Sequence, residues 1–291
     1  SDWLPIAAII PQAGVDGQRL FDFSGDCPRV VVFAILLSMT VGDFVSKGQQ
    51  LFDPQRWGRM DSSMNGLQVG RLDKPLKHLA TAVDACYESF RRAHELGADV
   101  LMVHHGLFWG KPLAITGEHL RRVQFLLDND ISLYAMHLPL DEHPEIGNNA
   151  VIARELGLLN VRPFGRYKGV EIGVQGELPA AVGLDELVQR LFGGREQVLR
   201  VLPFGADRVK TVGVISGGAP RELEQAVAAG LDVYITGDAS HEVYHMAQEA
   251  GINVVFGGHY ATETWGVRSA GELIARELGI EHTFVDVPTG L

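Results

Sequence analysis

Histidines recur in this sequence beside one another or at a fixed distance from a carboxylate. His104 and His105 are adjacent. Two further pairs share one spacing, a histidine with an acid four residues later: His137 with Asp141, and His259 with Glu263. Where such a segment is helical or tightly turned, both side chains lie on one face. Because carboxylates can bridge two metal ions while imidazoles fill other positions, the set predicts a dinuclear metal site. The alternative is a separate structural role for each histidine.

These residues follow short apolar runs of the kind that form strands. Histidine, glycine, serine or aspartate comes at the end of each of five such runs, at 98–104, 131–137, 209–215, 232–236 and 252–256. Ligands of open α/β sheets bind beyond the carboxyl ends of the strands, so we expect these polar residues to share a site. Neighbouring side chains on an extended chain point to opposite sides. His104 and His105 can therefore face one site only where the strand ends, at Gly106.

Amphipathic helix patterns alternate with the apolar runs, as is typical of parallel strands covered on both faces. We expect helices at residues 86–96, 117–128, 145–156, 220–229, 240–250 and 268–278. Further strands are expected at 77–84, 168–178 and 283–287, of which 168–178 has the even alternation of an antiparallel strand. The pattern predicts an α/β protein of two three-layer domains with mostly parallel sheets, at 39–165 and 166–291, and a boundary near 163–168.

Residues 1–38 differ from the rest of the chain, since proline and glycine are scattered there without a sustained period. Thr40, with Asp43 three residues later, predicts a helix N-cap. We therefore expect the fold to begin near Met39 and residues 1–38 to be an N-terminal extension outside the core fold. The alternative is an additional edge strand at 30–36.

Composition excludes several classes of function. The 291 residues include 25 Lys and Arg against 36 Asp and Glu, a net charge of −11, which disfavours binding to nucleic acid or anionic lipid. No apolar run approaches the roughly 20 residues that span a bilayer. Two cysteines are too few for a disulfide framework or a thiolate zinc site. We expect a cytoplasmic protein whose metal ligands, if any, are histidines and carboxylates.

Longer motifs surround the same residues, in chain order NGLQVG at 65–70, HHGLFW at 104–109, HLPLD at 137–141, GNN at 147–149, GD at 237–238 and GHYATE at 258–263. With these motifs, the chain from Met39 to its end resembles the GTP cyclohydrolase I type 2 homologue family, the Nif-three-like dinuclear metal-binding proteins. Tyr260 departs from the family pattern, in which a second histidine often follows His259. The stretch between 149 and 216 is too short for the inserted domain of some members.

The resemblance implies two α/β domains with two divalent metal ions in the cleft between them, and a ring-shaped homohexamer. The implied metal ligands are His104, His105, Asp141, His259 and Glu263. His137 and His245 match family positions that line the site, and we assign them catalytic roles. The ligand types suit zinc, manganese, iron or nickel and do not choose among them.

The resemblance also suggests a reaction, the opening of the purine ring of GTP. We expect a metal-dependent hydrolase acting on a small molecule, either a nucleotide or a related cyclic amide or phosphoester. Residues 217–219 would contact a phosphate, the alternative being an ordinary turn between strand and helix. Two other hypotheses compete with the enzyme. One is a metal-binding protein for storage, delivery or sensing without turnover, and the other is a protein-interaction scaffold built on the ring.

Overall fold

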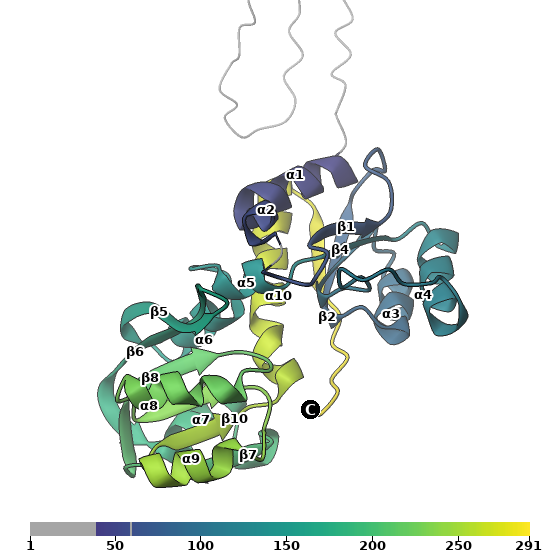
Figure 1. The fold of residues 1–291 in the computed structure, drawn as a ribbon. Helices are drawn as coiled ribbons and strands as arrows, with labels where there is room; N and C mark the ends of the chain where they lie inside the picture. Colours follow the sequence, from purple (N-terminus) through teal and green to yellow (C-terminus); the bar gives the residue numbers. More distant parts are fainter. Residues whose placement is uncertain (1–38, 59) are drawn as a thin grey trace, which may run out of the picture. The chain divides into compact units, whose positions relative to one another are not determined.

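Two β-sheets with helices packed against them make up the described part of the chain, residues 39–58 and 60–291 of this computed structural model (Figure 1). The predicted extension at 1–38 lies outside the described residues. The first sheet has the strand order β1-β4-β3-β2-β11. Its strands are β1 (Gly66–Val69), β2 (His78–Asp84), β3 (Val100–His105), β4 (Ser132–Ala135) and β11 (Glu281–Phe284).

The second sheet has the strand order β5-β6-β8-β9-β10-β7. Its strands are β5 (Leu159–Tyr167), β6 (Val170–Gly183), β7 (Arg200–Pro203), β8 (Arg208–Ile215), β9 (Val233–Thr236) and β10 (Asn253–Phe256). The helices are α1 (Val41–Phe52), α2 (Pro54–Trp57), α3 (Tyr87–Glu95), α4 (Gly117–Asp128), α5 (Leu138–Glu142), α6 (Asn148–Glu155), α7 (Leu184–Phe192), α8 (Leu223–Ala228), α9 (Val243–Ala250) and α10 (His259–Leu278). Two short 3₁₀ helices span Arg195–Gln197 and Pro220–Glu222.

The expected α/β class with two sheets is confirmed, but the two sheets differ in strand direction. In the first sheet only the β1–β4 pairing is antiparallel among the described strands. The second sheet is mixed, because β5, β6 and β8 pair antiparallel, as do β10 and β7. A two-residue turn joins β5 to β6, and so short a connection permits only an antiparallel pair. The expectation of mostly parallel strands thus holds for the first sheet alone.

Apolar side chains cover both faces of each sheet, which explains the continuous apolar runs of the central strands. On one face of the first sheet, Phe44 of α1 packs with Val267 and Ile274 of α10. On its other face, Phe90 of α3 and Leu126 of α4 form a separate core. The second sheet likewise separates two apolar clusters. Burial on both faces is what parallel strands in three-layer folds require.

The last helix and strand of the chain return to the first sheet. β11 pairs in parallel with β2, from Glu281 opposite His78 to Phe284 opposite Thr81. The predicted helix at 268–278 is longer than expected, since α10 begins at His259. The predicted boundary at 163–168 falls largely within β5. The division into 39–165 and 166–291 stays a prediction, and the return of β11 shows that the end of the second part pairs with a strand of the first.

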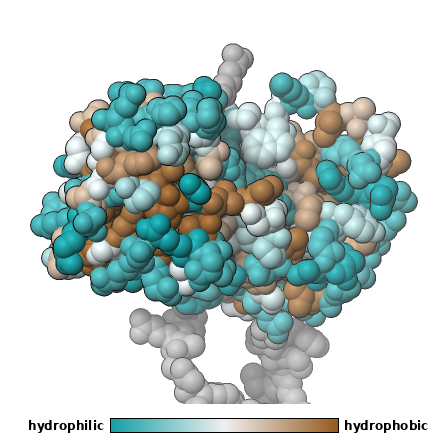
Figure 2. All heavy atoms as spheres, turned by 90° about the horizontal axis from the view of Figure 1, so that it is seen from below, coloured by the Kyte–Doolittle hydropathy of each residue, from teal (hydrophilic) through white to brown (hydrophobic). Residues whose placement is uncertain are grey.

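Two surface properties bear on partners. In the described part of the chain, no helix combines the length and apolarity needed to cross a bilayer. Figure 2 shows the face of the molecule seen from below the view of Figure 1. On this face, apolar residues gather over the second sheet, with hydrophilic residues around them. Exposed large apolar side chains include Leu113 and Ile115, before α4, and Leu159 and Val161, on the edge strand β5.

Candidate metal centre

The five predicted metal ligands meet around the carboxylate of Glu263, which α10 holds 3% exposed. Its Oε1 lies 3.4 Å from Nε2 of His104 and 3.3 Å from Nε2 of His259, and its Oε2 lies 3.3 Å from Nε2 of His105. Asp141 Oδ2 lies 3.4 Å from the same nitrogen of His104. Atoms bound to one tetrahedral ion at about 2.0–2.1 Å are about 3.3 Å apart. The separations therefore leave room for metal ions among these atoms.

Three segments deliver these side chains from elements far apart in the sequence. His104 and His105 end β3, whose preceding residues are fully buried between helices. Asp141 lies in the short helix α5, which starts after a two-residue connection from β4 and has proline in its first turn. His259 and Glu263 occupy the first turns of α10, which begins nine residues before the predicted helix, so their spacing of four residues places both on one helix face.

Each ring is held through its Nδ1 atom, which directs Nε2 to the centre. His104 Nδ1 donates to the carbonyl oxygen of Met136 at 3.0 Å. His105 Nδ1 donates to Asp84 at 2.8 Å, and His259 Nδ1 donates to Asp238 at 3.0 Å. A proton on Nδ1 leaves the Nε2 lone pair free for a metal ion. Such outer hydrogen bonds are what orient metal-bound histidines in proteins.

His137 joins the cluster, with a carboxylate partner of its own. Its Nδ1 donates to Asp61 at 2.9 Å, and its ring lies 4.9 Å from that of His104 and 5.0 Å from that of Trp109. Ligand atoms of His104, His105 and His137 lie within 4.8 Å of one another, as do those of His105, His259 and Glu263. His137 is therefore placed either to ligate a metal ion or to move a proton beside one.

His245 is not brought to the cluster, contrary to the expectation that it lines the site. It lies exposed on α9, where its ring packs edge-on against Tyr244 at 5.3 Å, and it does not line the pocket described below. The resemblance alone suggested a site position for His245, and the helix turns its side chain outward. A catalytic role for His245 stays an untested prediction without support from this geometry.

Asp61 is the most important site residue that sequence reasoning missed. Its side chain is 1% exposed. Besides the hydrogen bond from the ring Nδ1 of His137, it accepts hydrogen bonds from Asn65 Nδ2 and from the backbone amides of Ser63 and Leu138. Although burial opposes its charge, these donors lower its pKa to about 2. Asp61 follows α2 in a loop with no periodic pattern, so nothing in the sequence marked it. Asn65, the first residue of the NGLQVG motif, directly precedes β1, and its Oδ1 accepts a hydrogen bond from the amide of His137.

The GNN motif holds Asp141 in place. Asn148 Nδ2 donates to Asp141 Oδ1 at 2.9 Å, and Ser216 Oγ donates to the same oxygen at 3.1 Å. Asn148 also accepts from the amide of Gly266 in α10, while Asn149 accepts from the amide of Ser216 after β8. With Oδ1 held in this way, Oδ2 of Asp141 is the atom turned toward His104.

Two buried polar atoms of the cluster, His104 Nε2 and Glu263 Oε2, have no hydrogen-bond partner among the described residues. The residues nearest to them lie at 3.3–3.4 Å without the geometry of a hydrogen bond. Unpartnered buried polar atoms are uncommon because their desolvation is costly. A bound divalent cation would satisfy both atoms, so the residues present fit a metal site.

The charges of the cluster point the same way. Burial opposes a charge on His104, yet the nearby carboxylates of Asp141 and Glu263 raise its pKa well above the ordinary value. Burial likewise opposes the charge of Glu263, but His104 and His105 hold its pKa well below the usual range. The pKa of His259 rises to about 9 because Glu263 and Asp238 outweigh its burial. These carboxylates thus attract positive charge, whether protons or metal ions.

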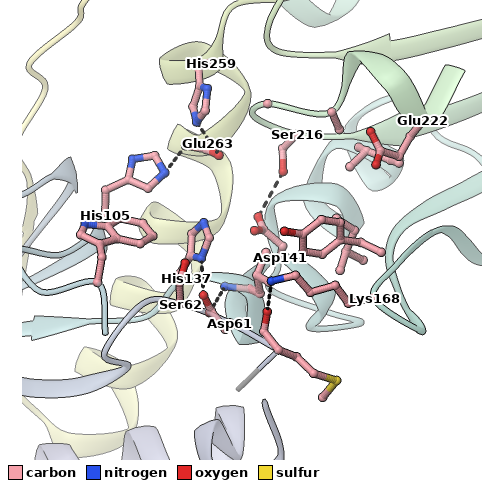
Figure 3. A pocket seen from close by; sticks show the side chains of 18 residues that line it. Asp61, Ser62, His105, His137, Asp141, Lys168, Ser216, Glu222, His259 and Glu263 are labelled. Atoms are coloured by element: carbon pink, nitrogen blue, oxygen red, sulfur yellow. Dashed lines mark hydrogen bonds and ion pairs between the residues drawn. The ribbon is translucent and has the colours of Figure 1, made fainter. Parts of the chain in front are cut away.

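A pocket of about 310 Å³ opens beside the cluster (Figure 3). His105, His137, Asp141, His259 and Glu263 form one side of it. The other lining residues come from both sheets and their loops: Met60, Asp61, Ser62, Trp109, Leu138, Tyr167, Lys168, Ile172, Ile215, Ser216, Gly218, Ala219 and Glu222. The residues predicted to contact a phosphate, 217–219, lie at this pocket or beside it. The carbonyl oxygen of Gly217 is occupied by the amides of Gly237 and Asp238.

Known proteins share this chain's sequence and fold. A protein of Archaeoglobus fulgidus named "GTP cyclohydrolase 1 type 2 homolog" is 48% identical over 231 residues, which cover 79% of this chain and 92% of the relative. One of the same name from Deinococcus radiodurans is 46% identical over 231 residues, covering 79% and 88%. The crystal structure of TTHA1606 from Thermus thermophilus is 39% identical, covers 87% of this chain and 100% of that one, and superposes with a TM-score of 0.79. The sequence profile of the family Duf34/NIF3 (NGG1p interacting factor 3) matches residues 39–290. This chain belongs to the DUF34/NIF3 family.

Proposed function

We propose that this protein is a metal-dependent hydrolase that holds two divalent ions with His104, His105, Asp141, His259 and Glu263. The observation that supports this proposal is that these ligand atoms converge while two of them, His104 Nε2 and Glu263 Oε2, are buried without a hydrogen-bond partner in the part of the chain that the structure describes. Two such ions would supply Lewis acidity and lower the pKa of a coordinated water. Zinc, manganese, iron and nickel all suit these ligands.

The chain's own residues would bind the substrate and move protons. His137 borders the pocket, and Asp61 fixes its Nδ1 as a donor, so Nε2 is the atom left to accept a proton from water or pass one to a leaving group. Trp109 contributes an aromatic surface beside His105 and His137, with ring centroids 5.9 Å and 5.0 Å away. This surface suits a planar ring and excludes water from one wall of the pocket.

The proposed substrate is a small molecule, a nucleotide or a related cyclic amide or phosphoester. The names of the relatives refer to GTP cyclohydrolase, and the pocket of about 310 Å³ has the size of a small-molecule site. Two divalent ions would offset the acidic charge locally, so a net charge of −11 does not weigh against an anionic substrate. Gly218, at the pocket wall, is the proposed phosphate contact within residues 217–219.

An activity screen with defined metals tests this proposal. Metal-stripped protein is reloaded with zinc, manganese, iron or nickel and assayed against nucleotides, phosphoesters and cyclic amides, in parallel with Asp141→Ala. We expect turnover with at least one metal and its loss in Asp141→Ala, together with reduced metal content. Asp128→Ala is the matched control, because Asp128 is an exposed carboxylate on α4.

The rival hypothesis, metal storage, delivery or sensing, gives a different result in the same screen. Wild-type protein would bind metal and Asp141→Ala would lose it, yet no substrate would be turned over with any metal. Normal cellular function of the ligand-site variants would instead favour the interaction scaffold.

We also propose the ring-shaped homohexamer implied by the family resemblance. The apolar residues grouped on the face in Figure 2 are the kind of surface that subunit contacts bury. Native mass spectrometry should then give six times the chain mass of 31.7 kDa. A monomer at micromolar concentration would contradict the hexamer and leave the metal proposal untouched. The cytoplasmic location stays a prediction from composition.

A further inference from the structure

One cationic side chain lines the pocket, and the proposed hydrolysis leaves it unused. Lys168 is the sole lysine or arginine among the described residues that form the pocket wall. It comes from the turn between β5 and β6, whereas the histidines of the pocket come from the end of β3, the residue before α5, and the start of α10. Figure 3 shows Lys168 on the side of the pocket away from His105 and His259.

The backbone at Lys168 adopts a conformation that disfavours lysine. Lys168 and Gly169 form the two-residue turn between paired Tyr167 and Val170, and their φ angles are +47° and +94°. Two positive φ angles are typical of a hairpin turn that prefers Asn, Asp or Gly at its first position. A lysine at this position is strained, and such strain is characteristic of functional positions.

The side chain of Lys168 is held across the pocket without a negative partner. Its Nζ donates to the carbonyl oxygen of Met60 at 2.9 Å and lies 5.0 Å from the centre of the Tyr167 ring. No carboxylate of the described residues lies within ion-pair distance of it, in contrast to Lys210, which pairs with Glu177 at 3.4 Å. An ammonium group has three donors, so two remain for a ligand.

We propose that Lys168 binds an anionic group, a carboxylate or a phosphate, of a substrate whose reacting group lies at the histidine and carboxylate cluster. This inference rests on the proposed function. Glu222 also lines the pocket and lies, like Lys168, on the side away from His105 in Figure 3. Because the other charged side chains of the described pocket wall, apart from histidines, are carboxylates, Lys168 is the group there that attracts the negative end of a substrate. The class of substrate is therefore a small molecule with one reacting group and a second, charged group separated from it by a spacer.

A ligand series of graded length tests the proposal in the metal-loaded protein. Phosphonoacetate, 3-phosphonopropionate and 4-phosphonobutyrate offer a phosphonate to the metal ions and a carboxylate at increasing reach. Each is compared by calorimetry with its neutral carboxamide. We expect one length to bind about tenfold more tightly than its carboxamide, a charge-assisted contact. Lys168→Met should abolish the ratio of carboxylate affinity to carboxamide affinity without changing the carboxamide affinity itself. Lys168→Arg should retain most of that ratio.

Lys210→Met, the removal of a lysine on β8 that does not line the pocket, is the matched control and should keep the wild-type ratio. Equal binding of every carboxylate and its carboxamide by wild-type protein would overturn the proposal. A ratio that survives in Lys168→Met would do the same. If Lys168→Met weakened the binding of carboxylates and carboxamides equally, Lys168 would only stabilise the pocket through its hydrogen bond to Met60, and the proposal would be wrong. Two other outcomes would contradict the proposed hydrolase and leave the anion contact of Lys168 intact. They are carboxamide binding that persists after metal removal, and the absence of turnover in the activity screen.

Discussion

At the scale of single residues, the candidate centre depends on the hydrogen-bond acceptors that hold the histidine rings. Asp84, Asp238 and the carbonyl oxygen of Met136 fix the Nδ1 atoms of three histidines, and Asp61 fixes that of His137. Without these acceptors, the imidazoles could rotate or carry their proton on Nε2, where it would block a metal ion. The strand-end position of Asp84 and Asp238 was visible in the sequence, but which histidine each one holds was not.

Replacement of Asp84 by alanine should weaken metal binding while leaving every proposed ligand in place. The lost hydrogen bond frees the ring of His105, and changes of this kind cost about 10–100-fold in metal affinity. Competition with a chromogenic chelator measures the affinity. Asp84→Asn, which can still accept a hydrogen bond, should fall between wild type and Asp84→Ala. Unchanged affinity in Asp84→Ala would show that His105 is not held by this contact.

As pH rises, the stability of the metal-free protein should fall, whereas the stabilisation by bound metal should increase. The pKa of His259 is raised from 6.5 to about 9 in the fold without metal, so its stabilisation is complete below pH 6.5 and disappears as pH rises through 9. Metal binding requires the neutral imidazole and strengthens over the same range. The difference in melting temperature between the two forms should thus widen from pH 6.5 to pH 9. A difference that stays constant or narrows would contradict this account, and His259→Gln should flatten the response of the metal-free form.

At the scale of elements, α10 connects the site to both sheets. Its first turns carry His259 and Glu263, its middle packs on the first sheet through Val267 and Ile274, and its Gly266 amide binds Asn148. The loop after β8 lies directly against this helix, because Gly217 N donates to Thr262 Oγ1 at 3.0 Å. Close approach of backbone and helix leaves no space for a side chain at Gly217.

Gly217→Ala should therefore disturb the centre, with Gly230→Ala as its matched control. The two glycines have nearly equal φ angles, +64° and +66°, so alanine costs about 1 kcal/mol in backbone strain at either. A Cβ at Gly217 would overlap Oε1 of Glu263, whereas one at Gly230 meets nothing within 4 Å. We expect both variants to have a lower melting temperature than the wild type. Only Gly217→Ala should lose metal, as measured by elemental analysis. Equal metal content in the two would show that Glu263 shifts without consequence.

At the scale of the whole molecule, the chain closes on itself around the first sheet. Val41 and Phe44 of α1 and Ile274 of α10 lie in one core, although the helices are more than 200 residues apart in sequence. The family profile begins at residue 39, where the described structure also begins. The start of the family match agrees with the predicted start of the fold near Met39, and the place of residues 1–38 outside the core stays a prediction.

A chain that starts at Met39 should fold and bind metal as the full chain does. The family profile matches residues 39–290, and the sequence of 1–38 has no sustained apolar period. Circular dichroism melts and metal content should match those of the 291-residue chain. Insoluble protein, or a large fall in melting temperature, would show that residues 1–38 contribute to the core and would favour the edge strand considered at 30–36.

The sequence by itself determined the α/β class, most central strands, and the ligand types at their ends, because burial on both faces leaves continuous apolar runs. The spacing of His259 and Glu263 predicted a shared face if the segment were helical, and the structure showed that α10 begins at His259. The structure alone decided three other points. It showed the full extent of antiparallel pairing in the second sheet, of which the sequence predicted one strand at 168–178, the outward position of His245, and the contacts of Asp61 and Lys168. Each of these depends on contacts between segments distant in the chain, which local periodicity does not encode. Asp61, with no pattern around it, becomes part of the site only when β4 and α5 bring His137 within hydrogen-bond distance.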